Sequence, residues 1–131
     1  MIVDTSAVIA ILRGEPDAGD LAHRMAEATE LVMSAGTHLE AAIVVDAAGD
    51  PVLSRRFDDL IATAGIRIEP WTAELAAIAR LAYRDFGKGS GHRAGLNFGD
   101  CFAYALARAT GQSLLFKGDD FIHTDVGARS G

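Results

Sequence analysis

The sequence predicts an α/β protein with a mainly parallel sheet. Short apolar runs at residues 1–3, 31–33 and 113–116, and an alternation of apolar and charged residues at 66–69, predict strands. They alternate along the chain with longer segments in which apolar residues recur every three or four positions. Strands that alternate with helices in this way are typical of parallel sheets packed against helices. No internal repeat, linker or low-complexity tract interrupts the pattern, so we expect a single domain over residues 1–131.

Local signals place the other elements in chain order. Helices are predicted at residues 7–12 and about 16–28 after the first strand, at 41–48 and 52–64 after the second, at 72–83 after the third, and from about residue 98 before the fourth. Residues 87–95 form the one clear loop, rich in glycine and carrying basic residues. The tail, residues 124–131, is expected to fray in part.

Composition restricts the class of protein. Half of the residues are apolar and 23% are charged, which is ordinary for a soluble globular protein. The net charge of −6 argues against simple electrostatic binding of nucleic acid, unless several of the acids surround a metal ion. The single cysteine, Cys101, rules out an internal disulfide and should pack as a small apolar residue. Nothing near the start resembles a signal peptide, so the expected location is the cytoplasm.

Three acids have an obvious structural explanation when each is taken alone. Asp4 directly follows the first strand, where it or a neighbouring hydroxyl could cap the next helix. Thr37 and Glu40 fit a capping box, in which the glutamate only returns a hydrogen bond to the N-cap. With Asn97 as N-cap, Asp100 would lie in the first helical turn, where an acid is favoured by the helix dipole. A functional site is indicated only if these acids converge.

The predicted topology brings the acids together. Asp4, Glu40, Asp100 and the pair Asp119-Asp120 each follow a strand or stand at the front of a helix. In a parallel sheet with right-handed crossovers, these positions share one edge. Clustered carboxylates repel one another, so such a site needs protons or cations. Oxygen ligands without Cys or His favour Mg²⁺ or Mn²⁺ over zinc.

Four pieces of the sequence together resemble the PIN-domain ribonucleases, and specifically the VapC-type toxins of bacterial toxin–antitoxin pairs. They are the opening Ile-Val-Asp-Thr-Ser-Ala at residues 2–7, Glu40 ahead of an apolar helix, Asn-Phe-Gly-Asp-Cys at 97–101, and Leu-Leu-Phe-Lys-Gly-Asp-Asp-Phe at 114–121. Their order and spacing span the whole chain. The resemblance implies a PIN-like three-layer α/β/α fold.

The resemblance also implies an activity, a cofactor and partners. The activity is Mg²⁺-dependent endoribonuclease cleavage, with Mn²⁺ as a substitute, and the partners are RNA, a VapB-like antitoxin that covers the acidic site, and a second copy of the chain. Lys88, Arg93 and Lys117 are candidates to contact the RNA backbone, and His92 could join them or be an exposed loop residue without a role.

Residue by residue, the resemblance assigns Asp4 and Asp100 to the metal and Glu40 to the same pocket. The fourth acid of the family often lies in a Thr-x-Asp-x-Asp-Phe pattern, but Phe116 and Gly118 stand at the Thr and first Asp positions here. Asp119 or Asp120 must then take that role, and we favour Asp119 as the fourth catalytic acid. Ser6 could instead be the polar partner of Asp4, Glu40 and Asp100.

Other classes of protein remain as alternatives. A phosphoacceptor receiver domain would need an aspartate at the end of a mid-chain strand, where this sequence has Glu69. A haloacid-dehalogenase-like phosphatase would need an aspartate where Ser6 stands. A non-catalytic partner-binding module, whose acids are all helix caps, is the third alternative. Metal-dependent cleavage of RNA would separate the third alternative from the nuclease.

Overall fold

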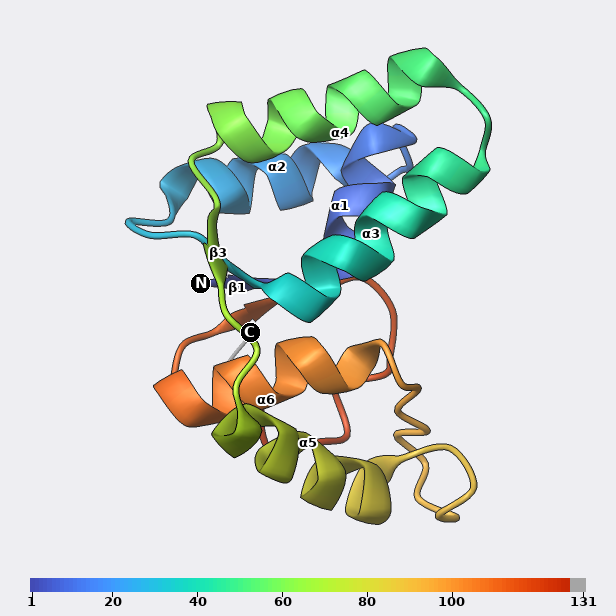
Figure 1. The fold of residues 1–131 in the computed structure, drawn as a ribbon, viewed down its shortest axis with the longest axis vertical. Coiled ribbons are helices and arrows are strands. Elements are labelled where there is room, and N and C mark those ends of the chain that lie inside the picture. Colours follow the sequence, from blue (N-terminus) through green and yellow to red (C-terminus); the bar gives the residue numbers. More distant parts are fainter. Residues whose placement is uncertain (128–131) are drawn as a thin grey trace.

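A four-stranded parallel sheet lies at the centre of the computed structural model, which describes residues 1–127 (Figure 1). Its strands are β1 (Ile2–Val3), β2 (Val32–Ser34), β3 (Arg67–Glu69) and β4 (Leu114–Leu115), arranged in the order β3-β2-β1-β4. Every neighbouring pair is parallel, as the sequence predicts. The carboxyl ends of all four strands therefore face the same edge of the sheet.

Helices cover both faces of this sheet. They are α1 (Thr5–Leu12), α2 (Ala18–Glu27), α3 (Ala35–Ala47), α4 (Pro51–Thr63), α5 (Ala73–Phe86) and α6 (Asp100–Thr110). In Figure 1, helices α1 to α4 lie on one side of the strands and α5 and α6 lie on the other, which gives three layers. Within residues 1–127, no helix is both long and apolar enough to cross a membrane.

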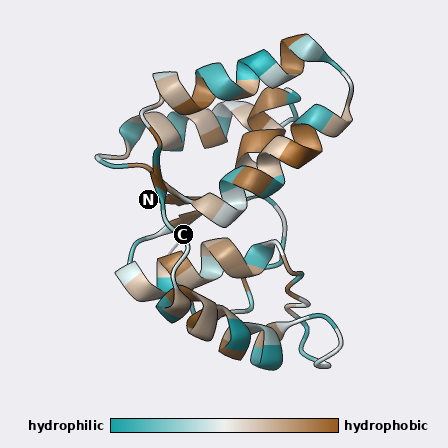
Figure 2. Cartoon of the chain, in the orientation of Figure 1, coloured by the Kyte–Doolittle hydropathy of each residue, from teal (hydrophilic) through white to brown (hydrophobic). Residues whose placement is uncertain are grey.

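Alternate strand residues face the two helical layers. Ile2, Val32 and Leu114 belong to the core formed with α5 and α6, whereas Val3, Met33 and Leu115 belong to the core formed with α1 to α4. All six side chains are almost completely buried. The strands at the centre of the sheet are accordingly mostly hydrophobic in Figure 2, while the helices mix apolar and polar residues.

Helix α3 begins earlier than the sequence predicts. Ser34 ends β2 and also caps α3, because its Oγ accepts a hydrogen bond from the Gly36 N–H at 3.2 Å. Thr37 and Glu40 consequently lie inside the helix, and the capping box predicted for them is wrong. Since Glu40 caps nothing, its carboxylate is available for other contacts.

The end of the chain is more ordered than the sequence predicts. Phe121 and Val126 are 1% and 0% exposed. The Tyr104 hydroxyl on α6 donates to Asp125 Oδ1 at 2.6 Å, and Arg108 forms an ion pair with the same carboxylate at 3.2 Å. The expected fraying is therefore wrong for residues 124–127, and residues 128–131 lie outside the described part of the chain.

Candidate active site

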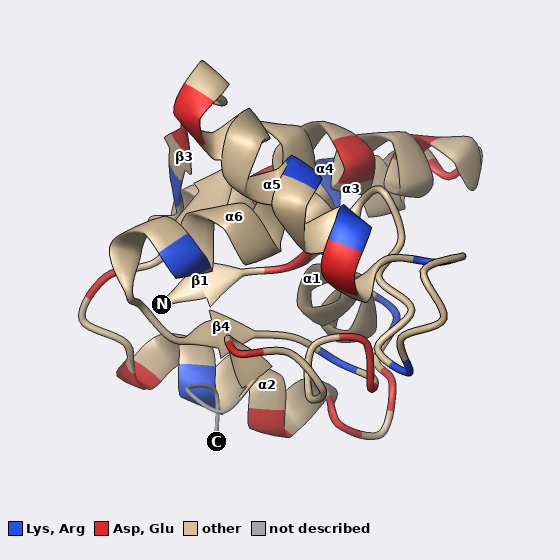
Figure 3. Ribbon diagram, turned by 90° about the horizontal axis from the view of Figure 1, so that it is seen from below, with Lys and Arg blue, Asp and Glu red and all other residues tan. Residues whose placement is uncertain are grey.

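Acidic side chains line a pocket of about 450 Å³ at the carboxyl edge of the sheet. Its acids come from the end of β1 (Asp4), the loop after α1 (Glu15), α3 (Glu40), the start of α6 (Asp100) and the loop after β4 (Asp120). In Figure 3 the chain between β1 and α1 has the red of acidic residues. The structure thus brings together the acids that the topology predicts to converge, although they are spread over more than a hundred residues.

Asp4 is buried with one oxygen satisfied and one left without a partner. Its Oδ2 accepts hydrogen bonds from the Ser6 backbone N–H at 3.0 Å and from the Ser6 hydroxyl at 2.6 Å. Its Oδ1 has no hydrogen-bond partner among the described residues. Burial raises the pKa of Asp4 to about 6, and the charge of Glu40 adds to this effect, although the bonds from Ser6 oppose it. A buried carboxylate oxygen without a donor is costly unless it is protonated or bound by a cation, so Asp4 Oδ1 is suited to bind one.

Ser6 also connects Asp4 to the last strand. Its hydroxyl oxygen accepts a hydrogen bond from the Lys117 backbone N–H at 2.9 Å, just beyond β4. The same hydroxyl group can therefore donate to Asp4 while it accepts from Lys117. These two hydrogen bonds of Ser6 fix the Asp4 side chain relative to the ends of β1 and β4.

Asp100 is 7% exposed and begins α6. Asn97 and Asp100 form two reciprocal hydrogen bonds, from the Asp100 N–H to Asn97 Oδ1 at 2.9 Å and from the Asn97 N–H to Asp100 Oδ2 at 3.0 Å. Asn97 thus closes the turn ahead of the helix. The N-cap position is Gly99, so the prediction of Asn97 as the N-cap is wrong.

The pKa of Asp100 is raised to about 8. Burial is the largest cause, followed by a side-chain hydrogen bond with Asp120 and by the charges of Asp4 and Asp120, while the bond from Asn97 opposes the shift. Two acids that share a hydrogen bond must share a proton, because one carboxyl group has to donate. A cation that replaced this proton would relieve the same repulsion.

Asp120, and not Asp119, faces the pocket. Asp120 lines it and interacts with Asp100, whereas the Asp119 side chain is exposed and does not line it. The structure therefore places Asp120, and not the Asp119 preferred from the sequence, beside the other acids of the pocket. The two residues are adjacent in a loop, so no periodicity in the sequence distinguishes them.

The pocket also contains residues that the sequence analysis did not single out. The Thr5 hydroxyl donates to Glu40 Oε1 at 2.6 Å. Glu15 lies at the rim and forms an ion pair with Lys117 at 3.2 Å, and Asp17 lies 3.4 Å from the same ammonium group. Lys117 is therefore neutralised by acids of the loop between α1 and α2. No signal in the sequence indicates these long-range pairs.

The basic loop lies between α5 and α6. Its ends are joined by backbone hydrogen bonds between Lys88 and Leu96 and between Leu96 and Phe86, each 2.8 Å long. His92 packs edge-on against Phe86, and its Nδ1 accepts from the Ala94 N–H at 3.0 Å, so His92 has a structural role in the loop. Arg93 is exposed and, like Lys88, forms no ion pair within residues 1–127.

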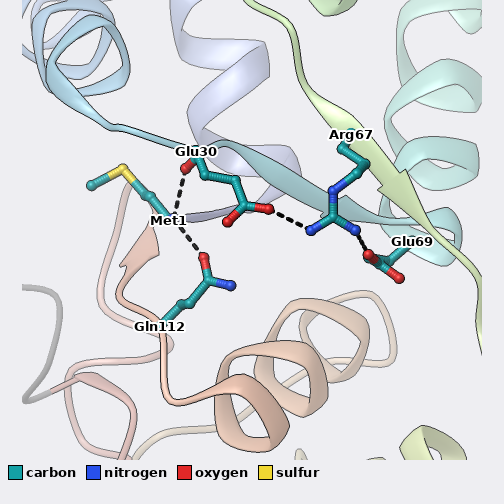
Figure 4. A network of polar contacts seen from close by, with 5 residues as sticks. All are labelled: Met1, Glu30, Arg67, Glu69 and Gln112. Carbon is teal, nitrogen blue, oxygen red and sulfur yellow. Dashed lines mark hydrogen bonds and ion pairs between the residues drawn. The ribbon is translucent and has the colours of Figure 1, made fainter.

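Glu30, which precedes β2, and Glu69, which ends β3, share a basic partner. Figure 4 shows Arg67 between Glu30 and Glu69, with ion pairs to both carboxylates. The Met1 amino group donates to the Glu30 carbonyl oxygen at 2.8 Å and to Gln112 Oε1 at 2.7 Å. Glu69 thus has a structural partner at the position where a receiver domain would need a phosphoacceptor. Among the described residues, Asp4, Glu40, Asp100 and Asp120 have no such basic partner.

The donor set of the pocket fits a divalent cation that prefers oxygen ligands. Within residues 1–127, no three His, Cys, Asp or Glu side chains already stand in a metal-binding arrangement. The fit rests instead on individual groups, namely the unpaired Asp4 Oδ1 and the Asp100 carboxyl group, whose pKa is raised in part by neighbouring acids. Carboxylates without Cys or His suit Mg²⁺ or Mn²⁺.

Comparison with known proteins agrees with the fold. The family model for the PIN domain matches residues 1–127. Ribonuclease VapC28 of Mycobacterium tuberculosis is 56% identical over 126 residues, covering 96% of this chain and 95% of that protein. Ribonuclease VapC of Mycolicibacterium smegmatis is 48% identical over 128 residues, covering 98% of each protein. The chain therefore belongs to the PIN-domain family, within the VapC ribonucleases.

A solved structure supports the same fold. The crystal structure of Mycobacterium tuberculosis VapC20, described as a sarcin-ricin loop cleaving toxin, matches with a TM-score of 0.69 over 92% of this chain and 91% of that chain. At 19% sequence identity this likeness concerns the fold alone. The comparisons confirm the family, the three-layer fold and the class of function expected from the sequence, a VapC-type toxin ribonuclease.

Proposed function

We propose that this VapC ribonuclease cleaves RNA phosphodiester bonds by hydrolysis with a divalent cation, Mg²⁺ or in its place Mn²⁺, held by Asp4 and Asp100. The observation that carries the proposal is the set of buried or partly buried carboxylates that face one another without a basic partner in the described chain. A bound cation supplies a Lewis acid for a phosphate oxygen and lowers the pKa of a coordinated water molecule.

The side chains around the pocket have separate roles in this proposal. Ser6 orients Asp4 and keeps its Oδ1 free. Asn97 holds one oxygen of Asp100, while Asp120 takes up or releases the proton that the two acids share. Glu40 lies in the same pocket and orients the attacking water molecule, since a carboxylate in hydrogen-bond reach can accept its proton. The proposal requires no side-chain nucleophile.

Removal of the metal is the experiment that tests the proposed function. Purified protein should cleave a single-stranded RNA in Mg²⁺ or Mn²⁺, stop in excess EDTA and recover when the cation is restored, because the carboxylates alone provide neither Lewis acid nor activated water. Cleavage should be followed with a fluorescently labelled RNA. Undiminished cleavage in EDTA would rule out the proposed chemistry.

The neighbouring pair Asp119 and Asp120 offers a matched test of the fourth acid. We expect Asp120→Asn to lower the cleavage rate by about 10–100-fold, as is typical when a group that supports a metal ligand is removed. Asp119→Asn should stay within about twofold of wild type, because its side chain is exposed outside the pocket. Initial rates in saturating Mg²⁺ measure both effects. The opposite ranking would restore Asp119 as the fourth acid.

Arg93 and Lys88 are exposed and form no ion pair within residues 1–127, so they are candidates to bind the RNA backbone, whereas the ammonium group of Lys117 is already paired with two acids. Arg93→Ala should weaken RNA binding and reduce the slope of log K against log salt by about 0.7, the value for one phosphate contact on a single strand. Arg56→Ala, which removes an exposed arginine of α4, serves as the control. Binding should be measured by fluorescence anisotropy in EDTA. An unchanged slope for Arg93→Ala would remove the loop from the RNA-binding surface.

We further propose two protein partners for this chain. One is a VapB-like antitoxin, which would cover the acidic pocket with a basic side chain, since Asp4, Glu40, Asp100 and Asp120 form no ion pair among the described residues. The other is a second copy of the chain. In support of a homodimer, Leu39 and Ile43 are 61% and 59% exposed and lie one turn apart on α3.

A further inference from the structure

The Glu40 carboxylate is enclosed by two residues that have no assigned role. Glu40 lies in the second turn of α3, Thr5 is the first residue of α1, and Gly99 directly precedes α6. Thr5 binds one carboxylate oxygen through its hydroxyl group, at 2.6 Å from Oε1. The other oxygen, Oε2, lies where a Cβ atom on residue 99 would be. One side chain of α3 is thus held between the starts of two other helices.

Gly99 is required for space and not for its backbone conformation. Its φ of −64° and ψ of −36° are ordinary helical values that any L-residue adopts. All of the nearest atoms that a Cβ would meet belong to the Glu40 carboxyl group. The glycines of the basic loop differ in this respect, because Gly89 and Gly91 have positive φ and open space around them.

Thr5 is suited to hold the carboxylate in one direction. A hydroxyl donor at 2.6 Å from a carboxylate is in the range of strong, charge-assisted hydrogen bonds. The β-branched side chain has few χ1 rotamers, so the direction of the hydroxyl group is restricted. With Oε1 held by Thr5, Oε2 is directed across Gly99 towards the start of α6, where Asp100 lies.

We propose that Thr5 and Gly99 are positioning residues, which together clamp the Glu40 carboxylate beside Asp4 and Asp100. The inference rests on the proposed function, because the clamp matters for a carboxylate that acts on the attacking water molecule or the cation. Thr5 acts by donating a hydrogen bond, and Gly99 acts by leaving room. Neither residue touches the reacting atoms.

Gly99→Ala separates positioning from folding. The added methyl group should displace the flexible end of Glu40 and leave the α6 backbone in place, because only carboxyl atoms obstruct it. Alanine is also favoured over glycine in helical conformation. We therefore expect an unchanged or higher Tm together with at least a tenfold loss of RNA cleavage. Gly19→Ala is the matched control, since Gly19 lies in α2 with open space around it, and it should keep full activity.

Thr5→Val and Thr5→Ser test the hydrogen bond. Valine keeps the shape of the side chain but removes the donor, so cleavage should fall by about 10–100-fold. Serine restores the donor and should bring cleavage back to within about threefold of wild type. In a second readout that is independent of cleavage, thermal unfolding at increasing Mg²⁺ should show a higher half-saturating concentration for Thr5→Val and Gly99→Ala than for wild type.

The results that overturn the clamp differ from those that overturn the proposed function. Wild-type cleavage and wild-type Mg²⁺ response in Gly99→Ala would overturn the clamp, and so would a Thr5→Ser protein as impaired as Thr5→Val. A wild-type protein that cleaves no RNA in Mg²⁺ would overturn the proposed function instead. The Mg²⁺ dependence of unfolding would still test whether Thr5 and Gly99 position Glu40 for a cation.

Discussion

Replacement of Asp100 by asparagine is expected to lower RNA cleavage by about 1,000-fold, which corresponds to about 4 kcal/mol of transition-state stabilisation. Asparagine keeps the shape of the side chain and an oxygen that can accept the Asn97 N–H. It removes the negative charge with which Asp100 is proposed to hold the cation. Initial cleavage rates of a labelled RNA in saturating Mg²⁺ measure the effect.

Asp85→Asn provides the control for this substitution. Asp85 is an exposed acid of α5 whose carboxylate pairs with Arg84, so its neutralisation should leave cleavage within about twofold of wild type. If Asp100→Asn also stayed within tenfold of wild type while it remained folded, Asp100 would be only a first-turn acid of α6.

The second large effect is expected on stability. Without metal, the free energy of unfolding should decrease as the pH rises from about 4 to about 8.5. The pKa values of Asp4 and Asp100 are raised in the folded protein, from 3.8 to about 6 and about 8. The folded protein therefore binds these protons more tightly than the unfolded chain, which adds to the free energy of unfolding. This contribution is complete below pH 3.8, the pKa in the unfolded chain, and it is lost as the pH rises through the pKa in the folded protein. Asp4 alone accounts for about 3 kcal/mol of this loss, at about 1.4 kcal/mol for each pKa unit.

Thermal or urea unfolding in EDTA across this pH range tests the expectation. Asp100→Asn should show a weaker pH dependence above pH 6 and should be more stable than wild type at pH 8, because like-charge repulsion is relieved. Mg²⁺ should stabilise wild type at pH 8 and do much less for the variant. A variant that unfolds at a lower temperature than metal-free wild type, with an undiminished Mg²⁺ response, would contradict a shared acidic pocket.

Much of the fold follows from patterns that are local in the sequence. The short apolar runs mark β1, β2 and β4, because side chains buried on both faces of the sheet are apolar. Asp4 and Asp100 stand out because each interrupts or adjoins an apolar pattern. The sequence predicts too late a start for α3, because Ser34 belongs to two elements, as the last residue of β2 and as the N-cap of α3. Capping preferences alone did not distinguish Ser34 from Thr37.

The finer parts of the pocket depend on long-range packing. The loop after β4 directs Asp120 inward and Asp119 outward, and adjacent acids look alike in the sequence. Lys117 is neutralised by residues about a hundred positions earlier, which no local pattern reveals. The proximity of Gly99 to Glu40 is likewise visible only when α3 and α6 are both in place.

The central claim is that the carboxylates at this edge of the sheet bind a divalent cation that takes part in RNA cleavage. Anomalous diffraction from crystals grown with MnCl₂ tests this most directly, because it locates Mn²⁺ without reference to activity. We predict an anomalous peak in the acidic pocket next to Asp4 and Asp100, and its loss in crystals of Asp100→Asn. A pocket without a peak, in crystals of protein that cleaves RNA in the same Mn²⁺ solution, would contradict the claim.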